Sequence, residues 1–192
     1  MGQLSLFSVQ ARAPLVADLA GLLCAQGQAL GFGRETAARI SVVLDGPWRA
    51  DAVARAFAAR GLVAQRHRTE AGHPLVRTAF LAELVPLAVL WSRGAVKAVP
   101  AGLQLDGALL RLWAVAAGRC DGRGYTLGLD PHAPGTHAPL AAALAAAGLA
   151  PASRRPREGG PALRIAGRRR IARLAELVGD PPDAAPSGSW PG

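Results

Sequence analysis

The stretch that decides the fold is Leu19-Ala-Gly-Leu-Leu-Cys-Ala-Gln-Gly27. It is apolar and ends in glycine, a common terminator of helices. Its small residues Ala20, Gly21 and Ala25 would let a second helix backbone approach closely. A segment of similar character, Ala114-Val-Ala-Ala-Gly-Arg-Cys-Asp-Gly122, follows 95 residues later. The sequence therefore predicts two buried helices, over residues 15–25 and 109–120, that pack against each other.

A second set of matches recurs at a fixed spacing of 87 residues, which indicates an internal duplication. The matched pairs are Val53 with Leu140, Phe57 with Leu144, Gly61 with Gly148, Leu62 with Leu149, Pro74 with Pro161, Arg77 with Arg164, Ile40 with Leu127, and Val42 with Leu129. The two spacings differ by eight residues, and the difference falls between Gly27 and Ile40. We interpret this segment as a loop that carries an insertion, the kind of change that duplicated folds tolerate.

Hydrophobic periodicity predicts the same order of elements after each buried helix. In the first half we expect a strand at 40–44, a helix at 48–60, a hairpin from 61–69 and 75–80, and a helix at 81–90. In the second half we expect a strand at 125–129, a helix at 139–147, a hairpin from 149–157 and 162–167, and a helix at 170–178. The predicted halves span residues 11–92 and 108–179, joined by a linker at 93–107. Residues 180–192 are rich in Pro, Gly and Ser and predict a disordered tail.

This arrangement resembles the LAGLIDADG homing-endonuclease-like family, because residues 19–27 match that signature at six of nine positions. The resemblance implies an α+β fold of two pseudo-symmetric αββαββα halves on one chain, with antiparallel sheets that form a saddle for double-stranded DNA. The chain is most similar in character to the degenerate N-terminal domain of the sporulation regulator WhiA. It leaves no room for the C-terminal helix-turn-helix of WhiA, so we expect further DNA recognition to come from a protein partner.

The resemblance also implies where catalysis would occur. In active members of the family, an acidic residue at the end of each motif helix holds a divalent cation that activates water. The corresponding positions here are Gln26 and Asp121. Asp121 could ligate Mg²⁺, whereas Gln26 offers only a neutral carbonyl oxygen. Asp121 is thus either a vestigial metal ligand or a solvated residue of the turn Cys-Asp-Gly-Arg-Gly.

Arginines recur on the strands that the family uses against DNA. Alternation places Arg77 and Arg164 on the polar face of matching strands, opposite their apolar neighbours. The remaining candidate DNA contacts are Arg66, Arg68, Arg154, Arg155, Arg157, Arg168, Arg169 and Arg170. Two-stranded ribbons fit the major groove, where Arg binds phosphate or guanine. The alternative interpretation is a solvated sheet face that only keeps the protein soluble.

Overall composition permits a polyanionic partner. There are 22 Lys and Arg residues against 13 Asp and Glu, a net charge of +9, although Lys97 is the only lysine. An arginine-rich set of this kind also arises from compositional bias. The longest apolar run, 78–91, contains Glu83 and Pro86 and is too short to span a membrane. Without a secretory signal pattern, we expect a cytoplasmic protein with two reduced cysteines, Cys24 and Cys120.

Three function classes remain open at this point. The first is a DNA-binding protein, with a WhiA-like regulatory role, that has lost cleavage and needs no cofactor to bind. The second is an active or nicking endonuclease that uses Asp121 and Mg²⁺. The third is a protein-interaction domain whose charge is compositional. Because both halves lie on one chain, we expect a monomer.

Overall fold

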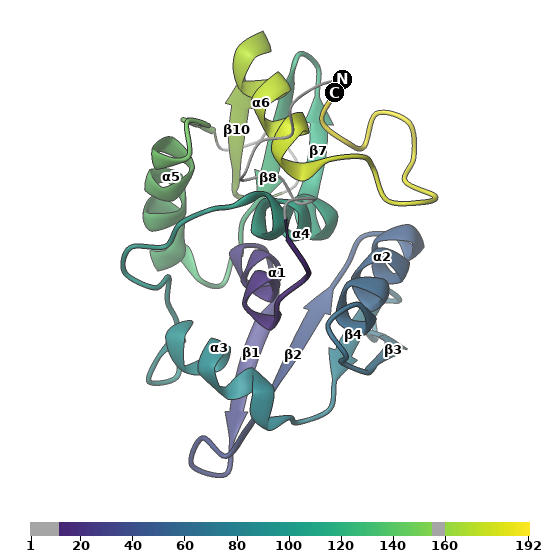
Figure 1. The fold of residues 1–192 in the computed structure, drawn as a ribbon, viewed down its shortest axis with the longest axis vertical. Helices are drawn as coiled ribbons and strands as arrows, with labels where there is room; N and C mark the ends of the chain where they lie inside the picture. Colours follow the sequence, from purple (N-terminus) through teal and green to yellow (C-terminus); the bar gives the residue numbers. More distant parts are fainter. Residues whose placement is uncertain (1–11, 155–159) are drawn as a thin grey trace.

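The computed structural model describes residues 12–154 and 160–192, and the described chain forms two halves of matching construction (Figure 1). The first half consists of η2 (Val16–Leu19), α1 (Ala20–Cys24), β1 (Gln28–Phe32), β2 (Ala37–Val43), α2 (Pro47–Ala58), β3 (Ala64–Arg68), β4 (Pro74–Thr78), η3 (Ala82–Leu84) and α3 (Val85–Leu90). A short hairpin of β5 (Ser92–Arg93) and β6 (Val96–Lys97) follows. The second half consists of α4 (Gly107–Ala117), β7 (Gly118–Asp121), β8 (Gly124–Gly128), η4 (Pro134–Thr136), α5 (His137–Ala146), β9 (Ala152–Arg154), β10 (Ala162–Ala166) and α6 (Arg168–Val178).

Each half contributes one four-stranded antiparallel sheet. The strand orders are β1-β2-β4-β3 and β7-β8-β10-β9, which are equivalent once the halves are superposed by element order. The predicted α+β fold of two αββαββα units is therefore confirmed. Within the described part of the chain, no helix is long and apolar enough to cross a membrane.

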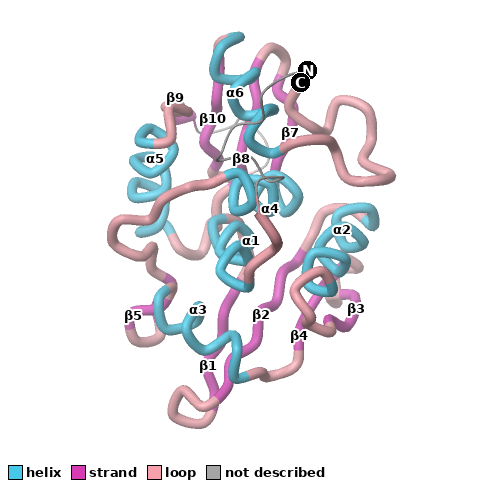
Figure 2. The backbone as a smooth tube through the Cα atoms, viewed as in Figure 1, coloured by secondary structure: helices cyan, strands magenta, loops and turns pink. Residues whose placement is uncertain are grey.

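Helices cover one face of each sheet and leave the other face open. Alternation along β2 buries Ala38, Ile40 and Val42 against the helices, while Arg39 and Ser41 point the other way. Helices α2 and α3 pack on the first sheet, and α4 and α6 pack on the second. In Figure 2 the strands of both sheets run behind the helices, so the uncovered faces lie on the far side. We call these uncovered faces the open faces.

The two halves meet where α1 crosses α4, in the middle of the molecule (Figure 1). Gly21 makes this crossing possible. A Cβ atom built on Gly21 would lie 2.1 Å from the carbonyl oxygen of Leu109 and 2.8 Å from Cβ of Leu112. No side chain fits between the two backbones at that point. The predicted role of Gly21 in close helix packing agrees with this geometry.

The start of the first half is held by a buried carboxylate, Asp18. Its oxygens accept hydrogen bonds from Arg12 at 2.6 Å, from Arg60 at 2.8 Å and from the backbone N–H of Leu15 at 2.8 Å. Burial by itself would raise the pKa of Asp18, but these hydrogen bonds outweigh it and hold the pKa below its ordinary value. Arg12 also binds Asp106, the N-cap of α4, and so joins the beginnings of both halves.

Several sequence expectations differ from the structure. The segment after Gly27, expected to be a loop, contains strand β1, which pairs with β2 from Gln28↔Ser41 to Phe32↔Ala37. The second central helix ends at Ala117 rather than Cys120, because residues 118–121 form strand β7. The expected linker contains the β5–β6 hairpin.

The C-terminal segment 180–192, expected to be disordered, lies against the second half. The indole N–H of Trp190 donates to the carbonyl of Gly179 at 2.7 Å, and the guanidinium of Arg111 lies 5.2 Å from the centre of the Trp190 ring. The hydroxyl of Tyr125 donates to the carbonyl of Ser189 at 3.3 Å. A single tryptophan thus provides the apolar contact that composition alone did not reveal.

Replacing Gly21 with alanine should destabilise the junction of the halves. The added methyl group has no free space, so the helices must separate, and we expect the free energy of unfolding to fall by at least about 2 kcal/mol. Urea denaturation followed by circular dichroism measures the change. Gly31→Ala is the matched control, because nothing lies within 4 Å of a Cβ atom at that strand position. Equal stability of both variants would contradict this account of the helix crossing.

Asp18→Asn should destabilise the protein by about 3 kcal/mol at neutral pH, because the buried Arg60 loses its charged partner. The pKa of Asp18 is lowered in the folded state, so its ion pairs stabilise the fold above the ordinary carboxyl pKa. That contribution is lost as the pH falls through the folded-state pKa. The gap between wild type and variant should therefore shrink in acid, as measured by urea denaturation over a pH series. Asp51→Asn removes an exposed pair with Arg66 and should cost less than about 1 kcal/mol.

Candidate nucleic-acid interface

Equivalent rows of side chains cross the open faces of the two sheets. In the first sheet, strand pairing places Gln28, Ser41, Arg77 and Gln65 side by side. In the second sheet, the corresponding row is Arg119, Thr126, Arg164 and Ala152. Paired residues of antiparallel strands share a face, so both rows point away from the helices. Arg77 and Arg164, predicted from the sequence to be equivalent, occupy the same position in these rows.

The two arginines have different neighbours. Arg77 donates from Nη2 to the ring nitrogen Nε2 of His67 at 3.3 Å, and both groups lie on the open face. Arg164 instead donates from Nε to the carboxylate of Asp121 at 2.6 Å and from Nη2 to its carbonyl oxygen at 3.2 Å. The Arg164 side chain crosses Gly124, where an added Cβ atom would lie 2.7 Å from the guanidinium. The structure thus joins two candidate site residues, Asp121 and Arg164, in one ion pair.

The predicted equivalence of Gln26 and Asp121 is wrong. The N–H of Leu44 donates to Pro74 and the N–H of Leu129 donates to Pro161, each at 2.9 Å, so these leucines are structurally equivalent. This makes Ser41 equivalent to Thr126, and their strand partners Gln28 and Arg119 are therefore equivalent as well. Two residues earlier in each half, Gln26 corresponds to Ala117.

The error arose because Gly118 and the residues after it imitate the motif while they begin a strand. A Cβ atom on Gly118 would lie 2.0 Å from the hydroxyl oxygen of Tyr125, so the chain needs glycine there as well. The spacing of 87 also placed Ile40 and Val42 two residues away from their true partners, Tyr125 and Leu127. A two-residue slip leaves the buried face unchanged, because side chains alternate with a period of two.

Lys97, the only lysine, caps the end of the first central helix. Its ammonium donates to the carbonyl oxygens of Ala25 at 2.7 Å and Gly27 at 2.8 Å, and to the carboxylate of Asp130 at 3.0 Å. All three of its donors are therefore satisfied, and the positive charge faces the negative end of α1. Burial lowers the pKa of Lys97, although the hydrogen bond to Asp130 opposes that shift.

Arg49 has the same role at the second central helix. It donates from Nη1 to the carbonyl oxygens of Ala114 at 3.1 Å and Val115 at 2.6 Å, and from Nη2 to that of Gly118. A carboxylate oxygen of Asp45 lies 2.6 Å from its Nε atom.

Asp45 and Asp130 each follow an equivalent strand, and each also contacts a polar residue near the start of the first strand of the opposite half. The amide of Gln28 donates to Asp130 at 2.6 Å, and Arg119 lies 3.5 Å from Asp45. The centre therefore has the same arrangement in both halves: an internal cation, Lys97 or Arg49, contacts the last carbonyl groups of each central helix.

This centre lacks the donor set of a metal site. The helix ends carry the neutral residues Gln26 and Ala117, and their last carbonyl oxygens are occupied by Lys97 and Arg49. Across residues 12–154 and 160–192, no group of three or more His, Cys, Asp or Glu side chains could hold a metal ion. Asp121 lies in the β7–β8 hairpin, away from the helix end, and is paired with Arg164. Its predicted role as a metal ligand has no geometric support.

The other predicted arginines divide into several groups. Arg66 pairs in register with the buried Val76 and binds Asp51 of α2, so it lies on the helix-covered side of the sheet. Arg68 shares that side and donates to the carbonyl of Gly72 at 2.9 Å. Arg154 ends strand β9, opposite Ala162, while Arg155 and Arg157 lie outside the described residues. Exposed Arg168, Arg169 and Arg170 begin helix α6.

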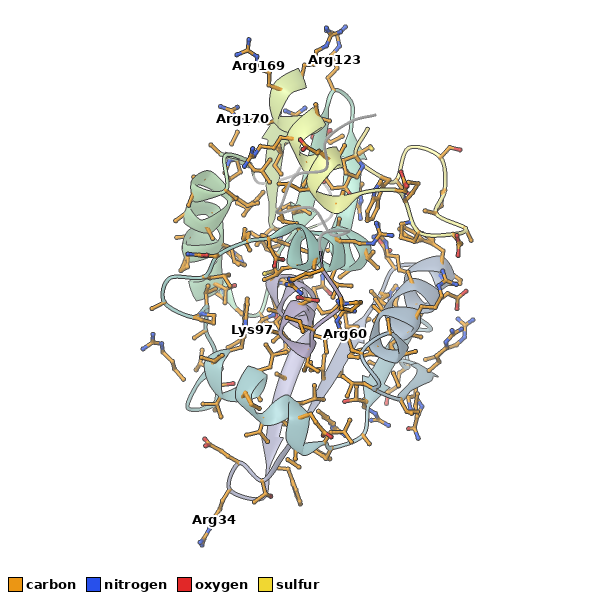
Figure 3. All side chains as sticks on the ribbon, viewed as in Figure 1. Arg34, Arg60, Lys97, Arg123, Arg169 and Arg170 are labelled. Atoms are coloured by element: carbon orange, nitrogen blue, oxygen red, sulfur yellow. The ribbon has the colours of Figure 1, made fainter. Side chains whose placement is uncertain are left out.

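Arginines also occur at the two ends of the molecule. Arg34 lies in the turn between β1 and β2, and Arg123 lies in the turn between β7 and β8. Figure 3 shows them at opposite ends of the long axis, with Arg169 and Arg170 at the same end as Arg123 and Lys97 close to the centre. By strand pairing, four arginines lie on the open faces, namely Arg39, Arg77, Arg119 and Arg164. The strands of both sheets contain only one acidic residue, Asp121, which is neutralised by Arg164. The open faces and their hairpin tips therefore form an extended basic surface.

Sequence reasoning missed the central cations, Lys97 and Arg49, and the arginines of the first hairpin in each half, β1–β2 and β7–β8. Lys97 carried one signal, as the only lysine in an arginine-rich chain, and the apolar and polar alternation of 37–43 could have placed Arg39 on the open face. Arg49 carried none, because an arginine near the start of a helix is ordinary. Its importance depends on long-range contacts with Ala114 and Val115.

Comparison with known proteins identifies the architecture. No protein-family model and no curated sequence matches the chain. The structure is similar to one described as the homing endonuclease I-WcaI bound to its DNA recognition sequence, with a TM-score of 0.60 and 12% sequence identity. The match covers 93% of this chain and 83% of that one. The chain thus has the fold of a single-chain LAGLIDADG endonuclease.

Proposed function

We propose that this protein binds double-stranded DNA along the open faces of its two sheets. The observation that carries the proposal is the pair of matching rows that contain Arg77 and Arg164, one on each sheet. At three of their four positions, both rows carry a side chain with a hydrogen-bond donor: Gln28 and Arg119, Ser41 and Thr126, Arg77 and Arg164. A two-stranded ribbon with such donors fits the major groove. The hairpin tips with Arg34 and Arg123 extend this basic surface along the molecule. The shared fold with a DNA-bound endonuclease supports the same surface.

We further propose that binding occurs without cleavage. Cleavage by two divalent cations needs carboxylates at the junction of the central helices, where this chain has Gln26 and Ala117. The internal cations Lys97 and Arg49 already satisfy the helix carbonyl oxygens. Because arginine binds phosphate without a metal, we expect DNA binding to need no metal cofactor. A protein that binds without cutting suits a regulatory role of the WhiA kind. With both halves on one chain, a monomer carries the complete surface.

Binding should be strongly dependent on salt, because arginine contacts to phosphates release counterions. Fluorescence anisotropy with a 30-base-pair duplex, over a series of salt concentrations, measures the slope of log affinity against log salt. Arg77→Gln should lower the magnitude of this slope by about one and weaken binding to all duplexes. Arg55→Gln, which changes an exposed arginine on α2 away from the open faces, should leave both unchanged. Absence of duplex binding at low salt would refute the proposed function.

Supercoiled plasmid incubated with the protein and Mg²⁺ should remain uncut. The reason is that the helix ends carry Gln26 and Ala117 in place of carboxylates, and that Asp121, in the β7–β8 hairpin, is paired with Arg164. Gel electrophoresis separates supercoiled, nicked and linear plasmid, and EDTA in place of Mg²⁺ gives the baseline. Nicking that needs Mg²⁺ and disappears in Asp121→Asn would establish the endonuclease alternative. Nicking that survives in this variant would come from a contaminating nuclease.

A further inference from the structure

The open face of the first half carries an exposed apolar cluster. Leu30 is 51% exposed, Phe32 is 63% exposed and Phe80 is 37% exposed. The rings of Phe32 and Phe80 lie 5.2 Å apart, and the guanidinium of Arg39 lies 4.8 Å from the centre of the Phe80 ring. Arg39 pairs in register with Leu30, so these side chains share the open face. Two aromatic rings and a leucine thus remain in solvent on a surface that the core does not use.

Arg39, which lies against this cluster, has a hydrogen-bond donor that the described residues do not use. Its Nε atom is buried and has no hydrogen-bond partner among the described residues. A buried donor without an acceptor is destabilising, and a ligand that supplies an acceptor to the Arg39 guanidinium would reduce this cost. The edges of bases and the phosphate oxygens of DNA are acceptors of this kind. The first sheet has no acidic residue in any of its strands, which favours a polyanionic ligand over a basic protein surface.

The second half differs at the equivalent positions. By the strand pairing, Leu30 and Arg39 correspond to Asp121 and Gly124, which also pair with each other. Phe32 corresponds in the same way to Arg123, at the tip of the shorter hairpin. One ribbon therefore presents apolar and aromatic groups, whereas the other presents charged groups. The two pseudo-symmetric halves therefore differ at the surface that faces the proposed ligand.

We propose that the β1–β2 ribbon recognises thymine through its C5-methyl group. This inference rests on the proposed binding of duplex DNA. The thymine methyl is the apolar group that the major groove presents, and apolar side chains recognise it by contact. Leu30 and Phe32 supply that contact, and Arg39 supplies a donor for a neighbouring base or phosphate. The β7–β8 ribbon, with Arg119 and Arg123, has donors that match the acceptors of guanine.

The test uses a bound duplex selected from a random library. Deoxyuridine, which lacks only the methyl group, then replaces thymine in one half of the selected site at a time. Substitution in one half should weaken binding about fourfold for each contacted methyl, the factor that corresponds to burying one CH₂ group. Substitution in the other half should leave affinity unchanged. Competition anisotropy measures both values.

Variants assign the effect to the cluster. In the double variant Leu30→Ala with Phe32→Ala, thymine and deoxyuridine duplexes should bind equally. Leu90→Ala is the matched control, because it removes a 60% exposed leucine from α3, which covers the opposite side of the sheet. Thermal denaturation of each variant establishes that it folds.

The outcomes separate the two proposals. If the protein retains no duplex in the selection, both the proposed function and this inference are overturned. Binding with equal affinity for thymine and deoxyuridine in both halves overturns only the inference. The inference is also overturned if the double variant retains the preference of the wild type, since the methyl contact would then lie elsewhere on the protein.

Discussion

The structure depends on the close crossing of α1 and α4. At Gly21 the two helix backbones leave no space for a side chain, which fixes their separation and relative position. Strands β1 and β7 begin within four residues of the helix ends, so the crossing also fixes where both sheets start. The rows that contain Arg77 and Arg164 follow from that placement through strand pairing alone. A contact in the core thus determines the spacing of basic groups on the surface.

Each of the two central helices ends in carbonyl groups that carry a partial negative charge. The chain neutralises them with Lys97 and Arg49 and balances these cations with Asp130 and Asp45. Lys97 reaches the first helix from the connecting segment, and Arg49 reaches the second helix from the first half. Each helix end is therefore completed from outside its own half. The halves are therefore interdependent, because Arg49 of the first half caps the second helix and Asp130 of the second half pairs with Lys97. Separation of the halves would leave these buried charges without partners.

The sequence predicted what local patterns control. The repeat could be recognised from helix periodicity, from the terminal glycines Gly61 and Gly148, and from the second hairpin of each half. Each of these features is determined by interactions within a few residues. The sequence could not show where the second central helix ends. That depends on Gly118 packing against Tyr125, a contact made across the β7–β8 hairpin. The candidate metal ligand Asp121 was misplaced for this reason, whereas Arg77 and Arg164 lay in segments whose spacing the repeat preserves.

Fusion of the halves explains how their surfaces can differ. In a symmetric dimer, every change on one ribbon is copied on the other, and the DNA site must be close to palindromic. On one chain, only residues that maintain the crossing and the helix caps are constrained to remain complementary. The ribbons are free of that constraint, and they have diverged to Leu30 and Phe32 in one half and Asp121 and Arg123 in the other. The same pseudo-dyad can therefore hold a centre that is alike in both halves and a binding face that is asymmetric.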